Sequence, residues 1–360
     1  MKFPVVPALA ALLLAMIPLS RAQDAEAKPA TESSAKNVAE SLTEAELDEV
    51  IAGIRAHFIK GEALSPLKVK IATVQGLLEQ LAPGVAILDA AKDAGPEASP
   101  FRSEILEKRI GYVRLGATSA ANLAELDKAL AGFAEKSVGA LVLDLRATPA
   151  GSQFDETAEV CRRLVAKGKV LFRIRKRDEK DEQVVTSKED PKFRGVIVVL
   201  VDRRTGGNAE VIAAVLRSHV NAMIIGQTTR GEAVQFQHVP LASGKLLRVA
   251  VAEVTLPDNV PVFPGGVKPD IAVEVAAEVT DEVLKAGLEK GVTELVYEQE
   301  RARMNEAALV AGTNPDLDAA QAAQKLKGEK PKPPLRDAVL QRAVDFITTL
   351  SIYEKRAPGK

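Results

Sequence analysis

The chain has 360 residues, of which 46% are hydrophobic and 27% are charged, so it can bury a sizeable core. Lys and Arg number 48 against 49 Asp and Glu, and this balance gives no support for a nucleic-acid partner. Cys161 is the only cysteine, which excludes an internal disulfide, and its apolar neighbours favour a core position over a catalytic one.

Residues 1–22 have the pattern of a secretory signal peptide. Lys2 supplies the positive end, an apolar run covers residues 5–19, and small residues precede the expected cleavage site. The run is short for a membrane span, which makes a buried or membrane-anchoring helix the weaker alternative. We therefore expect an exported protein, periplasmic or extracellular, with no membrane span after cleavage. The polar stretch that follows predicts a disordered linker over residues 23–41.

Residues 42–100 are predicted to form an N-terminal helical segment. Apolar residues at helical spacing predict one helix over 42–59, which Thr43 can cap, and a second over 67–81 that stops at a Pro-Gly pair. A patch rich in Pro, Gly and Ser then leads into the main body.

Residues 101–277 alternate between strand and helix patterns. The unbroken run of Val, Ile and Leu over residues 196–201 predicts a strand that is covered on both faces of its sheet. Alternating strands and helices indicate the α/β class with crossover connections. Strands are predicted over 110–115, 139–145, 170–175, 195–201, 222–225, 234–241 and 246–256, and helices over 120–135, 155–166 and 209–218.

The last part of the chain, residues 278–360, is predicted to be helical around a low-complexity loop. One or two helices cover 281–309, and an amphipathic helix covers 336–350. The loop, residues 312–335, ends in a run of Lys and Pro.

Five ordered blocks of the body resemble the C-terminal processing (tail-specific) peptidase family. The blocks are residues 110–115, 142–151, 198–210, 226–232 and 256–271. The resemblance implies a Clp protease/crotonase-like β-β-α core and a serine peptidase ancestry. Residues 72–83 are similar to the helix and turn that precede the family's PDZ domain, but the interval before Ile110 is too short to hold that domain. The family's module for binding a substrate's terminal carboxylate is therefore missing from this position.

The resemblance also locates the family's catalytic serine and lysine. The family's serine stands three residues before a glutamate that Glu210 matches, and this register places Gly207 at the nucleophile position. The family's spacing from serine to lysine leads to Glu232 at the base position. Loss of the nucleophile in a comparable serine protease lowers turnover by about 10⁶. The resemblance therefore implies a degenerate dyad and an inactive peptidase.

Other elements of the family's site are retained or ambiguous. Backbone N–H groups form its oxyanion hole, so the resemblance places a binding cleft at Ala150, Gly151, Gly206 and Gly207. The family's assisting glutamine falls on Gln235 if one residue is deleted after Glu232, whereas strict counting leads to Phe236. An acidic residue at position 232 in place of lysine is expected to favour neutral or basic ligands there.

Substitute catalytic residues have little support from the sequence. Thr205 and Ser152 are better explained as a turn residue and a helix N-cap than as nucleophiles. The three histidines, His57, His219 and His238, are far apart without the spacing of metal ligands, so we expect no metal and no cofactor.

The leading hypothesis is an exported, catalytically inactive peptidase homologue that binds peptides or protein partners in the envelope. One alternative is a serine-type hydrolase of the same family that uses a substituted nucleophile. Another alternative is a protein that binds small apolar ligands in the former cleft.

Overall fold

The computed structural model describes residues 41–59, 65–89, 99–146, 148–151, 154–177, 182–296 and 335–356. The contacts within the chain divide it into two compact units, Met1–Gln75 and Gly76–Lys360. The predicted signal peptide, nearly all of the predicted linker and loop, and Ser152 lie outside the described residues. No helix within the described ranges is long and apolar enough to cross a bilayer.

The first unit contains α2 (Glu44–His57) and most of α3 (Pro66–Gln80), close to the two predicted helices. Thr43 caps α2 as predicted, because its hydroxyl accepts from the Glu46 N–H while the Glu46 carboxylate accepts from the Thr43 N–H at 2.7 Å. Neither helix has a buried residue, and apolar side chains such as Ile54, at 45% exposure, face outward.

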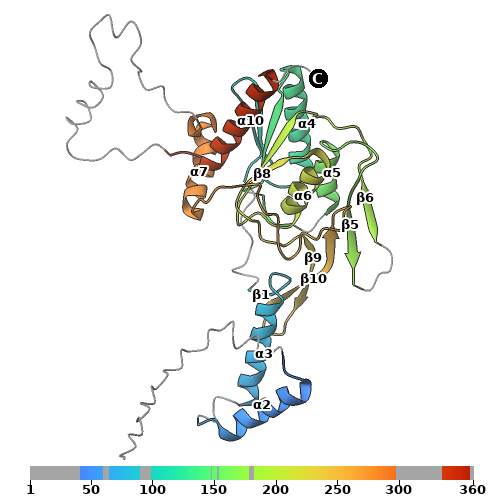
Figure 1. Ribbon diagram of the computed structural model, residues 1–360, viewed down its shortest axis with the longest axis vertical. Helices are drawn as coiled ribbons and strands as arrows, with labels where there is room; N and C mark the ends of the chain where they lie inside the picture. The colour runs from blue at the N-terminus through green and yellow to red at the C-terminus, as the bar shows by residue number, and fades with distance from the viewer. Residues whose placement is uncertain are drawn as a thin grey trace, which may run out of the picture. The chain divides into compact units, whose positions relative to one another are not determined.

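The centre of the second unit is a six-stranded sheet with the strand order β11-β8-β7-β4-β3-β2 (Figure 1). Neighbouring strands run parallel except β2, which is antiparallel to β3. The strands are β2 (Arg102–Leu106), β3 (Ile110–Arg114), β4 (Ala140–Asp144), β7 (Val196–Val201), β8 (Met223–Gly226) and β11 (Ile271–Ala272). Parallel strands joined by helices confirm the predicted α/β class.

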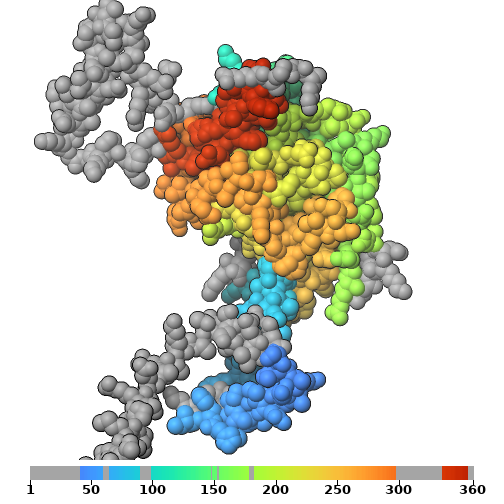
Figure 2. Space-filling view, in the orientation of Figure 1, coloured from blue at the N-terminus to red at the C-terminus, as the bar shows by residue number. Residues whose placement is uncertain are grey.

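Both faces of this sheet are covered, as the apolar run over residues 196–201 predicted. On one face Leu141 and Val199 pack into a core with side chains of α4 (Ala120–Glu135), α5 (Phe154–Arg162) and α6 (Asn208–Val220). On the other face Val142 and Val198 pack against α10 (Ala338–Arg356), and Figure 2 shows this helix lying against the second unit. Side chains alternate between the two cores because successive strand residues point to opposite faces.

A second, antiparallel sheet extends from the main body. It has the order β1-β10-β5-β6, with β9 paired to the other side of β10. Its strands are β1 (Val85–Leu88), β5 (Val170–Lys176), β6 (Gln183–Thr186), β9 (Val234–Pro240) and β10 (Leu246–Thr255). The helices α7 (Ala277–Lys290) and η2 (Thr293–Leu295) follow the sheets in the chain.

Candidate functional site

Gly207 occupies the N-cap of α6, directly after the turn that leaves β7. The turn is closed by the Asp202 carboxylate, which accepts from the N–H groups of Arg204 and Thr205, both at 2.9 Å. Gly207 has φ +56° and ψ −119°, a backbone conformation that disfavours residues with a Cβ. A Cβ built at this position would lie 2.2 Å from the carbonyl oxygen of Gly151. The fold therefore requires glycine at the predicted nucleophile position.

The four residues of the predicted cleft come together, but the N–H of Gly207 is not open to a ligand. Gly151 and Gly207 form an isolated parallel β-bridge, and the N–H of Asn208 donates to the Gly151 carbonyl at 2.9 Å. The N–H of Gly207 donates to Glu210 at 2.9 Å. A Cβ added to Gly206 would lie 3.3 Å from the Cβ of Ala150. The expectation of a free oxyanion donor at Gly207 therefore needs correction, because that donor has a partner within the protein.

Glu210, from which position 207 was counted, has a structural role. Its buried carboxylate accepts from the Thr229 hydroxyl and from the N–H groups of Gly207, Gly231 and Glu232. Burial raises the pKa of the Glu210 carboxyl, although the hydrogen bonds from Thr229 and the backbone act in the opposite direction. The result is that residues 229–232 are held against the start of α6.

Glu232 is only 1% exposed, and its charge is balanced within the protein. Its Oε1 accepts from Arg248 at 2.9 Å and from Arg230 at 3.1 Å, and the Arg248 guanidinium lies 4.3 Å above the ring of Phe236. Its Oε2 has no hydrogen-bond partner among the described residues and would be 3.2 Å from a Cβ on Gly206. The expected reversal of ligand preference does not follow, because two guanidiniums already neutralise this carboxylate.

The other predicted candidates lie elsewhere or are engaged in structural roles. Thr205 is fully buried, and its hydroxyl accepts from the Asp202 N–H at 3.0 Å, as expected for a turn residue. Gln235 lies on β9 opposite Ala252. The histidines stand on α2, α6 and β9, and no group of His, Cys, Asp or Glu in the described ranges could hold a metal ion. Cys161 is buried in the core, and burial raises its thiol pKa to about 12.

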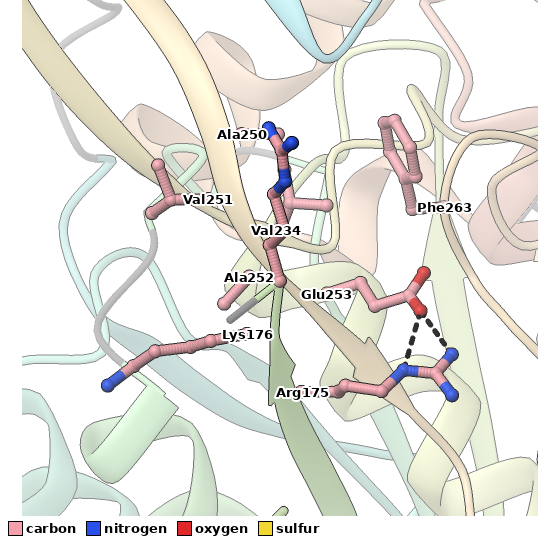
Figure 3. Close-up of a pocket in the computed structure, with 9 residues that line it drawn as sticks. Arg175, Lys176, Val234, Ala250, Val251, Ala252, Glu253 and Phe263 are labelled. Atoms are coloured by element: carbon pink, nitrogen blue, oxygen red, sulfur yellow. Dashed lines mark hydrogen bonds and ion pairs between the residues drawn. The ribbon is translucent and has the colours of Figure 1, made fainter. Parts of the chain in front are cut away.

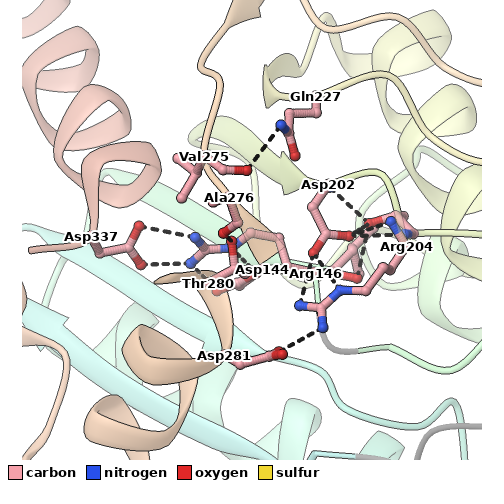
Figure 4. Close-up of polar contacts among 12 residues, drawn as sticks. Asp144, Arg146, Asp202, Arg204, Gln227, Val275, Ala276, Thr280, Asp281 and Asp337 are labelled. Atoms are coloured by element: carbon pink, nitrogen blue, oxygen red, sulfur yellow. Dashed lines mark hydrogen bonds and ion pairs between the residues drawn. The ribbon is translucent and has the colours of Figure 1, made fainter. Parts of the chain in front are cut away.

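A buried charge cluster near these turns was not predicted (Figure 4). The Arg146 guanidinium donates to Asp144 at 2.7 Å and to both carboxylate oxygens of Asp337 at 2.7 and 2.9 Å. Tyr112 donates its hydroxyl to Asp144 at 2.8 Å. Although burial alone acts to raise it, the pKa of Asp144 is lowered to about 2, chiefly by the positive charge of Arg146. Asp144 and Arg146 lie two residues apart at the end of β4, so their proximity could be seen in the sequence. Nothing in the sequence indicated Asp337 as their partner.

A second contact ties the turn after β7 to the C-terminal helices. Arg204 donates to Asp281 of α7 at 2.6 Å and lies 3.4 Å from Asp202 (Figure 4). Nearby, the Gln227 amide donates to the carbonyl of Val275 at 3.1 Å. The C-terminal helices therefore stabilise the turns that frame position 207.

A groove of about 320 Å³ lies on the antiparallel sheet (Figure 3). Val234, Ala252 and Phe263 are among its lining residues. Arg175 lies at its border, but its guanidinium already binds Glu253, with Nε 3.1 Å from Oε1. Because Arg175 and Glu253 pair with each other, neither side chain offers a free charge to a ligand in this groove.

Residues 109–273 match the sequence model of the family described as Peptidase family S41. This range contains every strand of the six-stranded sheet except β2, together with α6 and the residues around position 207. This part of the chain is therefore similar to peptidase family S41. The predicted resemblance to C-terminal processing peptidases and the predicted Clp/crotonase-like core are thereby confirmed.

Curated proteins similar to this region are named as processing proteases or peptidases. The carboxy-terminal processing protease CtpA of Bacillus subtilis is 26% identical over 53% of this chain and 41% of its own length. The C-terminal processing peptidase of Tetradesmus obliquus chloroplasts is 28% identical over 49% of this chain and 37% of its own length. The chain thus spans about two fifths of the length of these relatives.

Among solved structures, the photosystem II D1 C-terminal processing protease is similar to this chain. It is 26% identical, with 60% of this chain and 53% of that chain covered and a TM-score of 0.44.

Proposed function

We propose that this S41 domain is catalytically inactive and that the protein acts in the envelope by binding a peptide or protein partner. The observation that carries the proposal is Gly207, which has no side chain and whose space for one is occupied by the Gly151 carbonyl. An S41 peptidase requires an oxygen nucleophile within reach of a base, and position 207 supplies none.

The contacts of Glu232 support the same proposal. A base must be free to take a proton from the nucleophile, but one carboxylate oxygen of Glu232 binds two guanidiniums and the other faces Gly206. The Thr205 hydroxyl, a candidate substitute nucleophile, is buried in its own turn. These contacts favour a binding role over the alternative of a hydrolase with a substituted nucleophile.

The test is incubation of the purified protein with unstructured proteins and with a serine-directed fluorophosphonate probe. We expect no cleavage and no stoichiometric labelling. Intact-mass spectrometry after the probe reaction, followed by peptide mapping, would locate any labelled residue. Cleavage that persists through purification and is lost in Thr205→Ala or Ser152→Ala would contradict the proposal and identify the nucleophile.

Export is a part of the proposal that requires its own measurement. The signal-peptide pattern of residues 1–22 supports it. Cell fractionation with N-terminal sequencing should find the mature protein outside the cytoplasm and lacking Met1. A cytoplasmic protein that retains Met1 would contradict this assignment.

A further inference from the structure

A groove beside the C-terminal half of α6 has features of a ligand site that the S41 chemistry does not use. The groove, called here the α6 groove, has a volume of about 440 Å³, within the range of small-molecule sites. Its lining residues are Ala214, Arg217, Ser218, Leu256, Asp258, Val260, Pro261, Val262, Gly265, Gly266, Val267 and Lys268. Arg217 lies ten helical residues after Gly207, or about 15 Å along α6, so the cationic part of this groove is distant from position 207.

The walls of the α6 groove are apolar, and its backbone is held in place. Leu256, Val262 and Val267 are at least nine-tenths buried, whereas Val260 at the border is 51% exposed. The N–H of Gly266 donates to the Val262 carbonyl at 2.7 Å, and the N–H of Val267 donates to the Thr229 hydroxyl at 2.8 Å. Because these bonds define the loop, the groove exists before any ligand arrives.

Two cationic residues, Arg217 and Lys268, line the groove. The Arg217 guanidinium donates to the carbonyl of Lys268 and is 3.3 Å from the Asp270 carboxylate. Its Nε is buried without a hydrogen-bond partner among the described residues. Lys268 is exposed and forms no ion pair within the described ranges. A buried donor without an acceptor is costly, and an anionic oxygen from a ligand would satisfy it.

From this apolar wall and unsatisfied cationic end we propose that the α6 groove binds a free fatty-acid-like monocarboxylate. The tail would cover Val260 and Val262, and the carboxylate would accept from Arg217 and Lys268. Asp258 also lines the groove and Asp270 pairs with Arg217, so the donors left for a ligand are the Arg217 Nε and the Lys268 ammonium. A peptide fits less well because extended peptides need free main-chain partners, and the Val262 carbonyl and Val267 N–H are already bonded. The inference is independent of whether the S41 site is active.

The test uses three probes in calorimetric titrations of the full chain: decanoate below its micelle concentration, decan-1-ol and butanoate. Decanoate should bind at least fivefold more tightly than decan-1-ol, and butanoate should show no measurable binding. Equal affinity for decanoate and decan-1-ol would overturn the carboxylate assignment. A peptide with an apolar C-terminus that displaces decanoate at lower concentration would overturn the choice of a fatty acid.

Variants separate the two halves of the proposed site. Lys268→Gln and Arg217→Gln should each weaken decanoate binding about fivefold and leave decan-1-ol unchanged. Val260→Asp should abolish the binding of decanoate and of decan-1-ol. Val184→Asp on β6 is the control at a valine with the same exposure, 51%, that does not line the groove, and it should leave the binding of both probes unchanged. Lys268 and Val260 are exposed, so their variants should remain folded, and far-UV circular dichroism checks this. Unchanged decanoate binding in Val260→Asp would overturn the proposal.

Discussion

Serine at position 207 would bring its Cβ within 2.2 Å of the Gly151 carbonyl oxygen on a backbone with φ of +56°. We therefore expect Gly207→Ser to lower the free energy of unfolding by about 2 kcal/mol or more and to produce no peptidase activity. Urea unfolding measures the loss. Gly168→Ser is the matched control, since Gly168 also has positive φ, +83°, but nothing within 4 Å of an added Cβ. Equal losses in both variants would mean that Gly151 does not block position 207.

The family's lysine should not be restorable at position 232 either. Glu232→Lys would place a third cation beside Arg230 and Arg248 in a site that is 1% exposed. We expect a loss of about 3 kcal/mol in the free energy of unfolding, because a buried charge would lose its partners. Glu189→Lys makes the same charge change at an exposed position and should have little effect. Thermal melting of the two variants compares them, and a stable Glu232→Lys protein would contradict the assigned contacts.

At the residue scale, the sequence predicted which residue types occupy the site but not how they are joined. The resemblance to the family located position 207 by its spacing from Glu210, and position 232 by the family's spacing from serine to lysine. Neither the approach of Gly151 nor the partner role of Arg248 could be predicted, because both depend on contacts between segments distant in the chain. The charge of Glu232 is balanced by that tertiary contact, which the sequence does not reveal.

Asp337 attaches α10 to the end of β4 through Arg146. Asp337→Asn should lower the free energy of unfolding by about 3 kcal/mol, because the buried guanidinium loses one of its two anionic partners. Asp345→Asn on α10 is the control, because its carboxylate is exposed and, among the described residues, accepts only from Gln341. Chemical unfolding of both variants measures the difference. Equal stability of the two would show that Asp337 does not hold the helix.

The same cluster should make the protein sensitive to acid. The folded pKa of Asp144, about 2, lies below its usual value of 3.8, so its ionised form stabilises the native state. This contribution is complete above about pH 4 and is lost as the pH falls towards 2. It amounts to about 2 kcal/mol. Urea midpoints between pH 2 and 5 should fall with acid, and Asp144→Asn should flatten that slope. An equally steep slope in the variant would assign the sensitivity to other carboxylates.

Among the elements, long periodic segments were predictable and short irregular strands were not. The helix over residues 120–135 has the predicted bounds because its apolar residues recur at helical spacing over four turns. The strands β1 and β2 were missed. β1 is an apolar run of only four residues directly after a Pro-Gly pair, and β2 reads Arg-Ser-Glu-Ile-Leu, which contains no long apolar run. Their strand conformation comes from pairing with β10 and β3.

Across the whole molecule, the two units should differ in local stability. The amides of β7 lie in the middle of a sheet with both faces buried, whereas α2 has no buried residue. Hydrogen exchange should therefore be slow in β7 and approach the rate of an unfolded peptide in α2. Mass spectrometry of exchanged peptides measures both segments in one sample. Strong protection of α2 would show that another surface covers its apolar side chains.

The contact between Arg146 and Asp337 joins residues that are 191 positions apart. While residue 337 is still on the ribosome, β4 and Arg146 have been made, but the Arg146 guanidinium lacks one of its partners. The sheet face that α10 covers also remains open to water. Contacts between such distant positions slow folding, because a long loop must close before the contact is gained. The body should thus complete its folding only after the last helix has been synthesised. If the protein is exported as proposed, a nascent chain that stays unfolded for this long would remain available to the export machinery.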